Sequence, residues 1–392
     1  MSLPSVNWNY PTAVKVGAGR VRELPQWCES LGMRRPLLIT DPGLAALPLI
    51  GSVLDHCRSA GLECGLFHDI KGNPTGKNVD DGVAIFKAGG HDGVIAFGGG
   101  SALDAAKAVA LMVGQDRPLW DFEDIGDNYL RVNVAGMAPV VAVPTTAGTG
   151  AETNAFAVVT DPQTGRKFYV GHASSLPAAA ILDPELTHGL PPAATAATGM
   201  DALTHALESS MSRRANPWSD GIARQVIRMV GAHLPRAVQD GADREARAQM
   251  LLAAHLAGVG MATTGLGVCH AIGHALGGRF GIPHGVALTM VLPAVLRFNR
   301  PACADRLADV AFALGAGDTA HSTDWNATAA IEAISALAAA AGMIHRLSDF
   351  GITPADFDQI AADALDDEVL ANTPRMPTGS DIREMLAAPE IA

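Results

Sequence analysis

Aspartate and histidine recur at helical spacing in the second half of this 392-residue sequence, in a pattern that could bind a metal ion. Six of the 13 histidines lie between residues 201 and 284. Asp201 and His205 are four residues apart, and each such pair shares one face of a helix. His270 and His274 have the same spacing. A glycine-rich break follows them, and a reversal of the chain there can return His284 toward His270.

One carboxylate and three imidazoles form a ligand set for a divalent metal ion. These oxygen and nitrogen donors suit Fe(II), Zn(II), Co(II) or Mn(II) and are poor ligands for Cu(I). Structural zinc sites more often use several thiolates and close their coordination, whereas this set leaves room for a substrate oxygen. We therefore predict a catalytic metal site, rather than chance clustering of histidines, with the ligands Asp201, His205, His270 and His284.

His274 exceeds the needs of a four-ligand site, which leaves it available for a second role. We predict that it relays a proton between the metal site and solvent. Two other histidines of this region, His233 and His255, fit ordinary hydrogen-bonded positions. Cys269 precedes His270, but a neighbour on a helix points about 100° away, so we interpret it as a packing residue.

Two glycine-rich segments could bind an anionic cofactor. GGGSALDAAK (98–107) follows a strand candidate and precedes a helix, so free amides at the helix start can point at a phosphate. PTTAGTGAE (144–152) leaves another strand candidate and adds threonine hydroxyls. Neither is a GxGxxG or P-loop pattern, and plain glycine turns remain the alternative. Two such loops at strand ends favour a dinucleotide site formed by Gly98, Gly99, Gly100, Ser101, Asp104, Thr145, Thr146 and Thr149.

Asp41 places a carboxylate at a third strand end, after PLLIT. A carboxylate there can bind a ribose diol and repel the additional phosphate of NADP, which favours NAD as the cofactor. The competing interpretation is that Asp41 only forms a turn with Pro42 and Gly43.

The elements that must position these side chains change in type near residue 187. Before it, short apolar runs alternate with amphipathic segments, which predicts βαβ units and a parallel sheet with helices on both faces. Ligands should then bind at the carboxyl ends of the strands. The strand candidates are 35–41, 93–100 and 139–146, the helical segments are 44–60 and 79–88, and residues 155–161 and 166–172 favour a hairpin.

After residue 187, apolar and charged residues recur at helical spacing and few strand candidates remain. We therefore predict an α/β Rossmann-like NAD-binding domain with a parallel sheet at residues 1–187 and an all-helical metal-binding domain at residues 188–392. Helices are expected at 193–212, 219–238, 243–260 and 325–343.

Composition argues against several classes of protein. The net charge of −12 disfavours nucleic acid or an anionic membrane as the main partner and favours a small molecule. Five scattered cysteines without a CxxC pair fit a reducing compartment. No apolar run reaches the roughly 18 residues of a membrane span, and the N-terminus lacks the pattern of a signal peptide. We expect a mature cytoplasmic protein.

Four segments, taken in order, resemble the iron-containing (group III) alcohol dehydrogenases, in particular their lactaldehyde and 1,3-propanediol reductase members. They are GGGSALDAAK, PTTAGTGAE, TGMDALTHALE and GLGVCHAIGHALGGRFGIPHG. The resemblance extends from AVKVGAG near the N-terminus to LDDEVLANTPR near the C-terminus. It implies the dehydroquinate synthase-like architecture, an NAD(P) domain followed by a helical domain with a divalent metal ion, usually iron. It also implies a homo-oligomer, a dimer or larger.

The resemblance also implies a role for individual residues. The family holds its metal with the DxxxH pair, the first histidine of HxxxH and the histidine of PHG, which Asp201, His205, His270 and His284 match. The complete ligand set counts against the metal-independent reductases of the family. His274 resembles the active-site histidine near the nicotinamide. The implied cofactor contacts are Asp41, Asn73, Gly99, Ser101, Thr145, Thr146, Thr149 and Lys167.

The expected reaction is the reversible oxidation of a primary alcohol, a diol or a hydroxy acid to the aldehyde. Fe(II), or alternatively Zn(II), would act as a Lewis acid that lowers the pKa of the alcohol. NAD, favoured over NADP, would accept the hydride. The alternatives are a dehydroquinate-synthase-like lyase and a non-catalytic nucleotide-binding protein.

One departure from the related propanediol and lactaldehyde enzymes concerns the substrate. Those enzymes carry aromatic residues before PHG, where this chain has Gly278, Arg279 and Phe280. An arginine that faced the substrate would select an alcohol with an anionic tail, such as 4-hydroxybutyrate. An exposed arginine would have no such role.

Overall fold

The structure is a computed structural model that describes residues 10–70, 72–163 and 165–388. The chain divides into two compact units. The α/β unit comprises Tyr10–Thr146 and Gly150–Thr187. The helical unit begins at His188 and also includes the short segment Ala147–Thr149. A parallel sheet followed in sequence by helices confirms the predicted fold class.

The sheet of the α/β unit consists of six described strands, all parallel, in the order β1-β8-β5-β4-β2-β3. The three predicted strands are β2, β4 and β5, and they are adjacent. The other three strands lacked a clear signal because they are short or poor in β-branched residues. The hairpin of β6 and β7 forms as predicted. The bounds are β1 Ala13–Val16, β2 Pro36–Ile39, β3 Gly65–Phe67, β4 Gly93–Gly98, β5 Val140–Pro144, β6 Phe156–Thr160, β7 Lys167–Gly171 and β8 Ala179–Leu182.

The order of the strands reverses between β2 and β4. The chain passes from β2 outward to β3, returns to the opposite side of β2 as β4, and continues outward through β5 and β8. In open parallel sheets a ligand binds at the carboxyl ends of the strands on either side of such a reversal. Asp41 follows β2 and Gly99 follows β4, so the sheet brings two of the predicted cofactor residues to this position.

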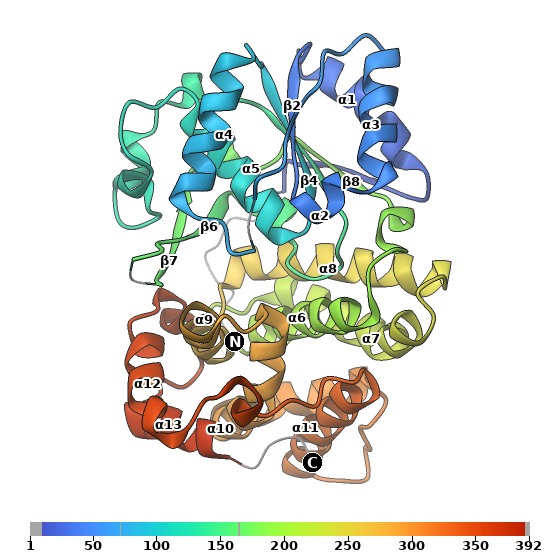
Figure 1. The fold of residues 1–392 in the computed structure, drawn as a ribbon. Coiled ribbons are helices and arrows are strands. Elements are labelled where there is room, and N and C mark those ends of the chain that lie inside the picture. Colours follow the sequence, from blue (N-terminus) through green and yellow to red (C-terminus); the bar gives the residue numbers. More distant parts are fainter. Residues whose placement is uncertain (1–9, 71, 164, 389–392) are drawn as a thin grey trace. The chain divides into compact units, whose positions relative to one another are not determined.

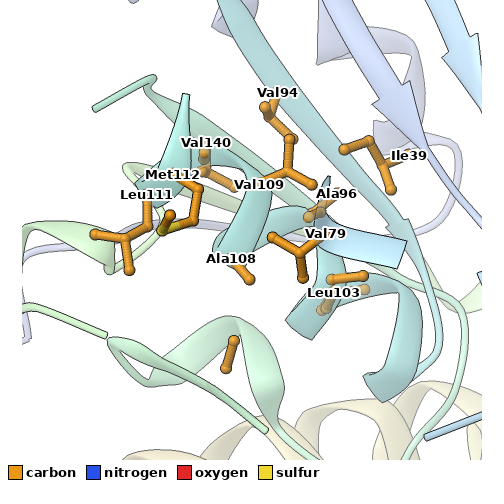
Figure 2. Close-up of a cluster of buried hydrophobic side chains, with 14 of the residues drawn as sticks. Ile39, Val79, Val94, Ala96, Leu103, Ala108, Val109, Leu111, Met112 and Val140 are labelled. Carbon is orange, nitrogen blue, oxygen red and sulfur yellow. The ribbon is translucent and has the colours of Figure 1, made fainter. Parts of the chain in front are cut away.

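Alternate residues of the buried strands point into two separate cores, one on each face of the sheet. In β2, Ile39 belongs to one core and Leu38 to the other. The first core packs the sheet against α4 and α5, and Figure 2 shows Ile39, Val79 and Leu103 from these elements together. Burial of a side chain of this size stabilises the fold by about 1.5–3 kcal/mol. The strand runs are therefore apolar throughout, because both faces are covered.

The helices of the α/β unit cover the sheet on both sides, with α1 and α3 opposite α4 and α5 (Figure 1). The single helix predicted at residues 44–60 is wrong, because the chain breaks after Ala45 and restarts at Pro48. Proline lacks the amide hydrogen that a helix interior requires, so it occupies the first turn of the new helix. The bounds are α1 Leu24–Ser30, α2 Pro42–Ala45, α3 Pro48–Ser59, α4 Gly76–Ala88 and α5 Gly100–Met112.

The helical unit is built around α6, which packs against α7, α8 and α10. The four predicted helical segments correspond to α6, α7, α8 and α11. No single described helix is long and apolar enough to cross a membrane; α8 and α9 meet that criterion only as a pair, bent by 108°. The bounds are α6 Pro192–Met211, α7 Pro217–Gln239, α8 Arg244–Thr264, α9 Val268–Phe280, α10 His284–Ala313, α11 Thr323–Ala340, α12 Phe357–Leu365 and α13 Gly379–Ala387.

Candidate functional site

Three helices of the helical unit bring the four predicted metal ligands together. Asp201 and His205 lie one turn apart on α6, His270 lies in the first turn of α9, and α10 begins at His284. The reversal predicted between His270 and His284 occurs at Gly281, whose φ of +68° ends α9 in the left-handed region.

A close approach of α10 to α6 depends on Gly285. A Cβ at this position would lie 2.0 Å from the backbone oxygen of Ala197, so only glycine allows the two helices to meet there. Because His284 precedes Gly285, this contact sets the position of the His284 imidazole relative to Asp201.

One carboxylate oxygen lies at the centre of the cluster. The Nε2 atoms of His205, His270 and His284 lie 3.3, 3.7 and 3.6 Å from Asp201 Oδ1. The ligand atoms of Asp201, His270 and His284 all lie within 4.8 Å of one another. His205 is outside that group, although it makes the shortest of the three approaches to Asp201. The His205 and His270 rings stack, with centroids 4.8 Å apart.

The geometry of these donors fits a bound cation better than a hydrogen-bond network. Asp201 Oδ1 and His270 Nε2 are buried and have no hydrogen-bond partner among the described residues. Such atoms are rare in proteins unless an unseen ion or water satisfies them. Two ligand atoms bound to one tetrahedral metal ion at about 2.1 Å are separated by about 3.4 Å. The observed distances from Asp201 lie close to this value, so the residues present fit a metal ion.

Burial and neighbouring charges shift the pKa values of these donors in different directions. Burial lowers the pKa of His205 to about 4, so its nitrogen is free of a proton at neutral pH. Burial opposes a charge on His270 as well, but Glu208 and Asp201 outweigh it and raise its pKa to about 9. Burial acts to raise the pKa of Asp201, but the neighbouring histidines, His205 foremost, hold it below its ordinary value. The carboxylate is therefore ionised. His284 is the most exposed of the four, at 27%, so the cluster opens to solvent on its side.

Sequence reasoning missed two carboxylates, one bonded to His270 of the cluster and one to the neighbouring His274. Glu208 accepts a hydrogen bond from His270 Nδ1 at 2.6 Å, and Asp367 lies 2.7 Å from His274 Nδ1. Glu208 follows Asp201 by seven residues on α6, so helical spacing could have identified it. Asp367 lies 93 residues from His274, and no local pattern connects them.

His274 lies beside the ligands, as expected for a neighbour on the same face of α9. Its ring stacks on His284 with centroids 5.5 Å apart. Because a carboxylate only accepts hydrogen bonds, His274 Nδ1 carries the hydrogen that Asp367 accepts. Asp367 Oδ1 is itself held by the amide of Val369, which fixes the pair.

Arg279 does not carry a free cation. Its guanidinium bonds Asp363 of α12 at 2.9 Å through Nε and at 2.6 Å through a terminal nitrogen. The pair is about one third exposed. The structure thus gives Arg279 a partner other than a substrate carboxylate.

In the α/β unit, the two glycine-rich loops leave neighbouring strands. Gly98 pairs with Pro144 in the sheet, and the Thr145 amide donates to the Gly98 carbonyl at 2.9 Å. A Cβ on Gly99 would lie 3.3 Å from Thr146 Cγ2, so the loops are in contact. Helix α5 begins at Gly100, and its preceding residue, Gly99, provides no side-chain cap. Uncapped amides at a helix start are suited to a phosphate.

Asn73 lies at the same edge of the sheet. The backbone amide of Asn73 donates to Ser101 Oγ at 3.3 Å. This bond brings together two residues that the sequence associates only through the resemblance. Asn73 has φ of +56°, and it is the one non-glycine residue in the described ranges with positive φ. Such strain concentrates at functional sites.

Asp41 uses one carboxylate oxygen for structure. Oδ1 accepts from the amide of Leu44 at 3.0 Å and caps α2. This bond agrees with the competing interpretation, in which Asp41 forms a turn with Pro42 and Gly43, as far as Oδ1 is concerned.

Asp104 and Lys107 of α5 form a buried ion pair with an N–O distance of 3.1 Å. Lys107 Nζ also donates to Ala151 O and Asn154 Oδ1, each at 2.7 Å, and to Phe156 O. These bonds connect α5 to the segment that follows the second loop. The structure thus gives Asp104 an ion-pair partner within the α/β unit. Lys167 begins β7 and adds positive charge near Asp104.

Thr149 belongs to the part of the second loop that groups with the helical unit. The neighbouring Gly148 packs on α6, where a Cβ would lie 2.6 Å from Thr198 Cβ. Thr198 precedes Asp201 by three residues, so within the helical unit the segment Ala147–Thr149 packs on the helix that carries two predicted ligands.

Comparison with known proteins matches both halves of the chain to one family. The family described as "Iron-containing alcohol dehydrogenase" matches residues 11–184, and "Fe-containing alcohol dehydrogenase family, C-terminal" matches residues 195–389. A solved structure described as 1,3-propanediol oxidoreductase superposes with a TM-score of 0.93 at 36% identity, covering 97% of this chain and 99% of that chain.

Curated relatives align over nearly their full length. The 1,3-propanediol dehydrogenase of Klebsiella pneumoniae is 37% identical over 97% of this chain and 96% of its own. The NAD-dependent methanol dehydrogenase of Bacillus methanolicus is 35% identical over 97% and 98%. The 4-hydroxybutyrate dehydrogenase of Cupriavidus necator is 36% identical over 96% and 98%. These matches show that the chain belongs to the iron-containing alcohol dehydrogenase family, whose members act on small alcohols and aldehydes.

Proposed function

We propose that this protein catalyses the reversible NAD-linked oxidation of a primary alcohol to its aldehyde with a divalent metal ion, Fe(II) or alternatively Zn(II). The observation that carries the proposal is the convergence of Asp201, His270 and His284 donor atoms on one buried position. A divalent ion bound there would act as a Lewis acid that makes an alcohol oxygen easier to deprotonate.

We assign the roles within the site as follows. Asp201, His205, His270 and His284 hold the ion, and the buried Asp201 Oδ1 and His270 Nε2 atoms, which lack a hydrogen-bond partner among the described residues, support this assignment. His274 accepts the alcohol proton at Nε2 and passes it to solvent, since Asp367 occupies its other nitrogen. The partial exposure of His284 supports access from that side.

Within the same proposal, residues 1–187 bind NAD and residues 188–392 hold the metal. The reversal of strand order between β2 and β4, and the uncapped start of α5, support a dinucleotide at the carboxyl ends of these strands. The name of the Bacillus methanolicus relative supports NAD. The proposed contacts are Asp41, Asn73, Gly98, Gly99, Gly100, Ser101, Asp104, Thr145, Thr146, Thr149 and Lys167.

The substrate proposed is a short primary alcohol or diol, in line with the 1,3-propanediol relative. The Cupriavidus necator relative keeps 4-hydroxybutyrate as a second candidate. The Arg279 pair with Asp363 gives that candidate no support from Arg279, because the guanidinium is already neutralised. We also propose a cytoplasmic homo-oligomer, which light scattering on the purified protein tests for size.

The deciding experiment is anaerobic purification, metal analysis and an NADH formation assay. The protein is stripped with a chelator, reloaded with Fe(II) or Zn(II), and assayed with 1,3-propanediol, 1-butanol and 4-hydroxybutyrate. We expect activity only in the reloaded protein. Full activity in the metal-free protein, or an absence of NADH formation with every alcohol, contradicts the proposal. A lyase would give no net NADH.

A further inference from the structure

Glu208 is a buried carboxylate to which the proposed reaction assigns no task. It lies on α6, seven residues after Asp201 and three after His205, so the three side chains follow one stripe of the helix. Its side chain is 4% exposed. An ionised group so far from water needs strong partners, and Glu208 has three.

All three partners of Glu208 belong to the start of α9. Oε2 accepts from His270 Nδ1 at 2.6 Å and from the Gly267 amide at 2.9 Å, and Oε1 accepts from the Cys269 amide at 2.7 Å. Gly267, the residue that precedes α9, has no side chain with which to cap it. A Cβ there would lie 3.1 Å from Oε1, so glycine leaves room for the carboxylate.

These contacts determine which nitrogen of His270 faces the ligand cluster. A carboxylate only accepts hydrogen bonds, so Nδ1 must donate, and Nε2 is left to point toward Asp201 Oδ1, 3.7 Å away. Partners of this kind fix the tautomer and the orientation of histidines that bind metals.

We infer that Glu208 is a positioning residue of the metal site, which holds His270 with Nε2 toward the ion and strengthens metal binding through that histidine. The inference rests on the proposed function, because it takes the cluster to be a metal site. The competing explanation is that Glu208 only caps α9.

The substitution Glu208→Gln separates the two explanations. Glutamine has one accepting oxygen and a donating amide group, so it cannot accept from all three donors. We expect the Kd for Co²⁺, added alone to metal-free protein and measured by chelator competition, to weaken by about 10–100-fold. The ligand-field spectrum of bound Co²⁺ should also change, because His270 is no longer held in place.

The matched control is Asp243→Asn. Asp243 caps α8 by accepting from the Ala246 amide at 3.0 Å, and it contributes nothing to the ligand cluster. This variant should bind Co²⁺ as the wild type does. If Glu208→Gln lowers thermal stability but keeps the wild-type Co²⁺ affinity and spectrum, Glu208 is only a cap and the inference is overturned.

A double-mutant cycle tests whether the effect passes through His270. In a His270→Gln background, Glu208→Gln should cost no further Co²⁺ affinity, whereas independent, additive losses overturn the inference. If Glu208→Gln does not fold, Glu208→Asp replaces it, because the shorter side chain keeps the charge but cannot reach all three donors. Wild-type Co²⁺ binding by this variant would also overturn the inference.

These measurements use neither NAD nor alcohol, so the two proposals can fail separately. A wild-type protein that binds Co²⁺ through Glu208 and His270 but oxidises no alcohol contradicts only the proposed reaction. An active wild-type enzyme whose Glu208→Gln variant binds Co²⁺ normally contradicts only the inference.

Discussion

Two residues to which we assign a chemical task, Asp41 and Glu208, also have a structural one. Asp41 caps α2 through Oδ1 while its charge lies at the end of β2. Glu208 holds the start of α9 and the His270 ring together. In such cases a substitution to alanine removes both tasks, and an amide substitution is needed to separate them.

Asp41→Asn should relax the preference for NAD without loss of stability. Asparagine caps a helix about as well as aspartate, but it carries no charge to repel the additional phosphate of NADP. We expect the ratio of kcat/KM with NAD to kcat/KM with NADP to fall roughly fivefold or more, as the loss of about 1 kcal/mol of repulsion implies. Asp41→Ala should lose about 1 kcal/mol of stability in addition. An unchanged cofactor ratio in both variants would show that Asp41 is only a cap.

Metal affinity should depend on pH through His270. Its pKa of about 9 means that the metal-free site holds a proton below that pH, and a metal ion must displace it. We expect Co²⁺ to bind about tenfold more weakly for each unit that the pH falls between about 8.5 and 7, and to reach a plateau above 9. Chelator competition at several pH values measures this. A flat profile over the same range contradicts a proton on His270.

At the scale of the elements, the site depends on how closely helices approach one another. Both Gly285 on α10 and Gly148 in the second loop allow contact with α6 that a Cβ would prevent. The arrangement of the donor cluster therefore depends on positions that carry no functional group.

Two matched substitutions test this point, one at a crowded glycine and one at an open glycine. Gly285→Ala places a methyl group against the Ala197 carbonyl, and overpacking of this kind costs about 1–3 kcal/mol of unfolding free energy or more. It should also weaken Co²⁺ binding, since His284 is the adjacent residue. At Gly221 on α7 a Cβ would meet no atom within 4 Å, so Gly221→Ala should raise the unfolding free energy by about 0.5–1 kcal/mol. Denaturant unfolding measures both, and equal stability of the two variants would refute the close-packing argument.

At the scale of the whole molecule, the two proposed ligands belong to different compact units. The four proposed metal ligands lie in the helical unit, while the strand ends proposed for NAD lie in the α/β unit. A ligand stabilises the structure that binds it in proportion to the logarithm of its concentration. Metal and cofactor should therefore protect different parts of the chain.

Metal removal provides the corresponding test. Free Co²⁺ at about 100 times its Kd should add about 2.7 kcal/mol to the unfolding free energy. Hydrogen exchange should slow in α6, α9 and the start of α10, and the effect should be absent in Asp201→Asn, which lacks the central carboxylate charge. NAD alone should slow exchange near β2, β4 and α5 instead. Uniform protection by either ligand would contradict this division.

The sequence by itself determined the features that depend on local periodicity. The α/β alternation, the three adjacent strands β2, β4 and β5, and the Asp201–His205 and His270–His274 pairs could be predicted, because residues two apart on a strand or four apart on a helix share a face whatever the rest of the chain does. Helix ends that depend on proline were partly missed, as the break before Pro48 shows.

Tertiary structure alone decided the rest, because distant segments meet only through packing. It placed His284 3.6 Å from Asp201, brought Asp367 to His274 across 93 residues, and set the strand order that joins β2 to β4 at the point of reversal. It also showed that Arg279 already has a partner in Asp363. The sequence shows which charged and metal-binding side chains the protein has, while the folded chain decides which of them already form an ion pair or a hydrogen bond with a neighbour.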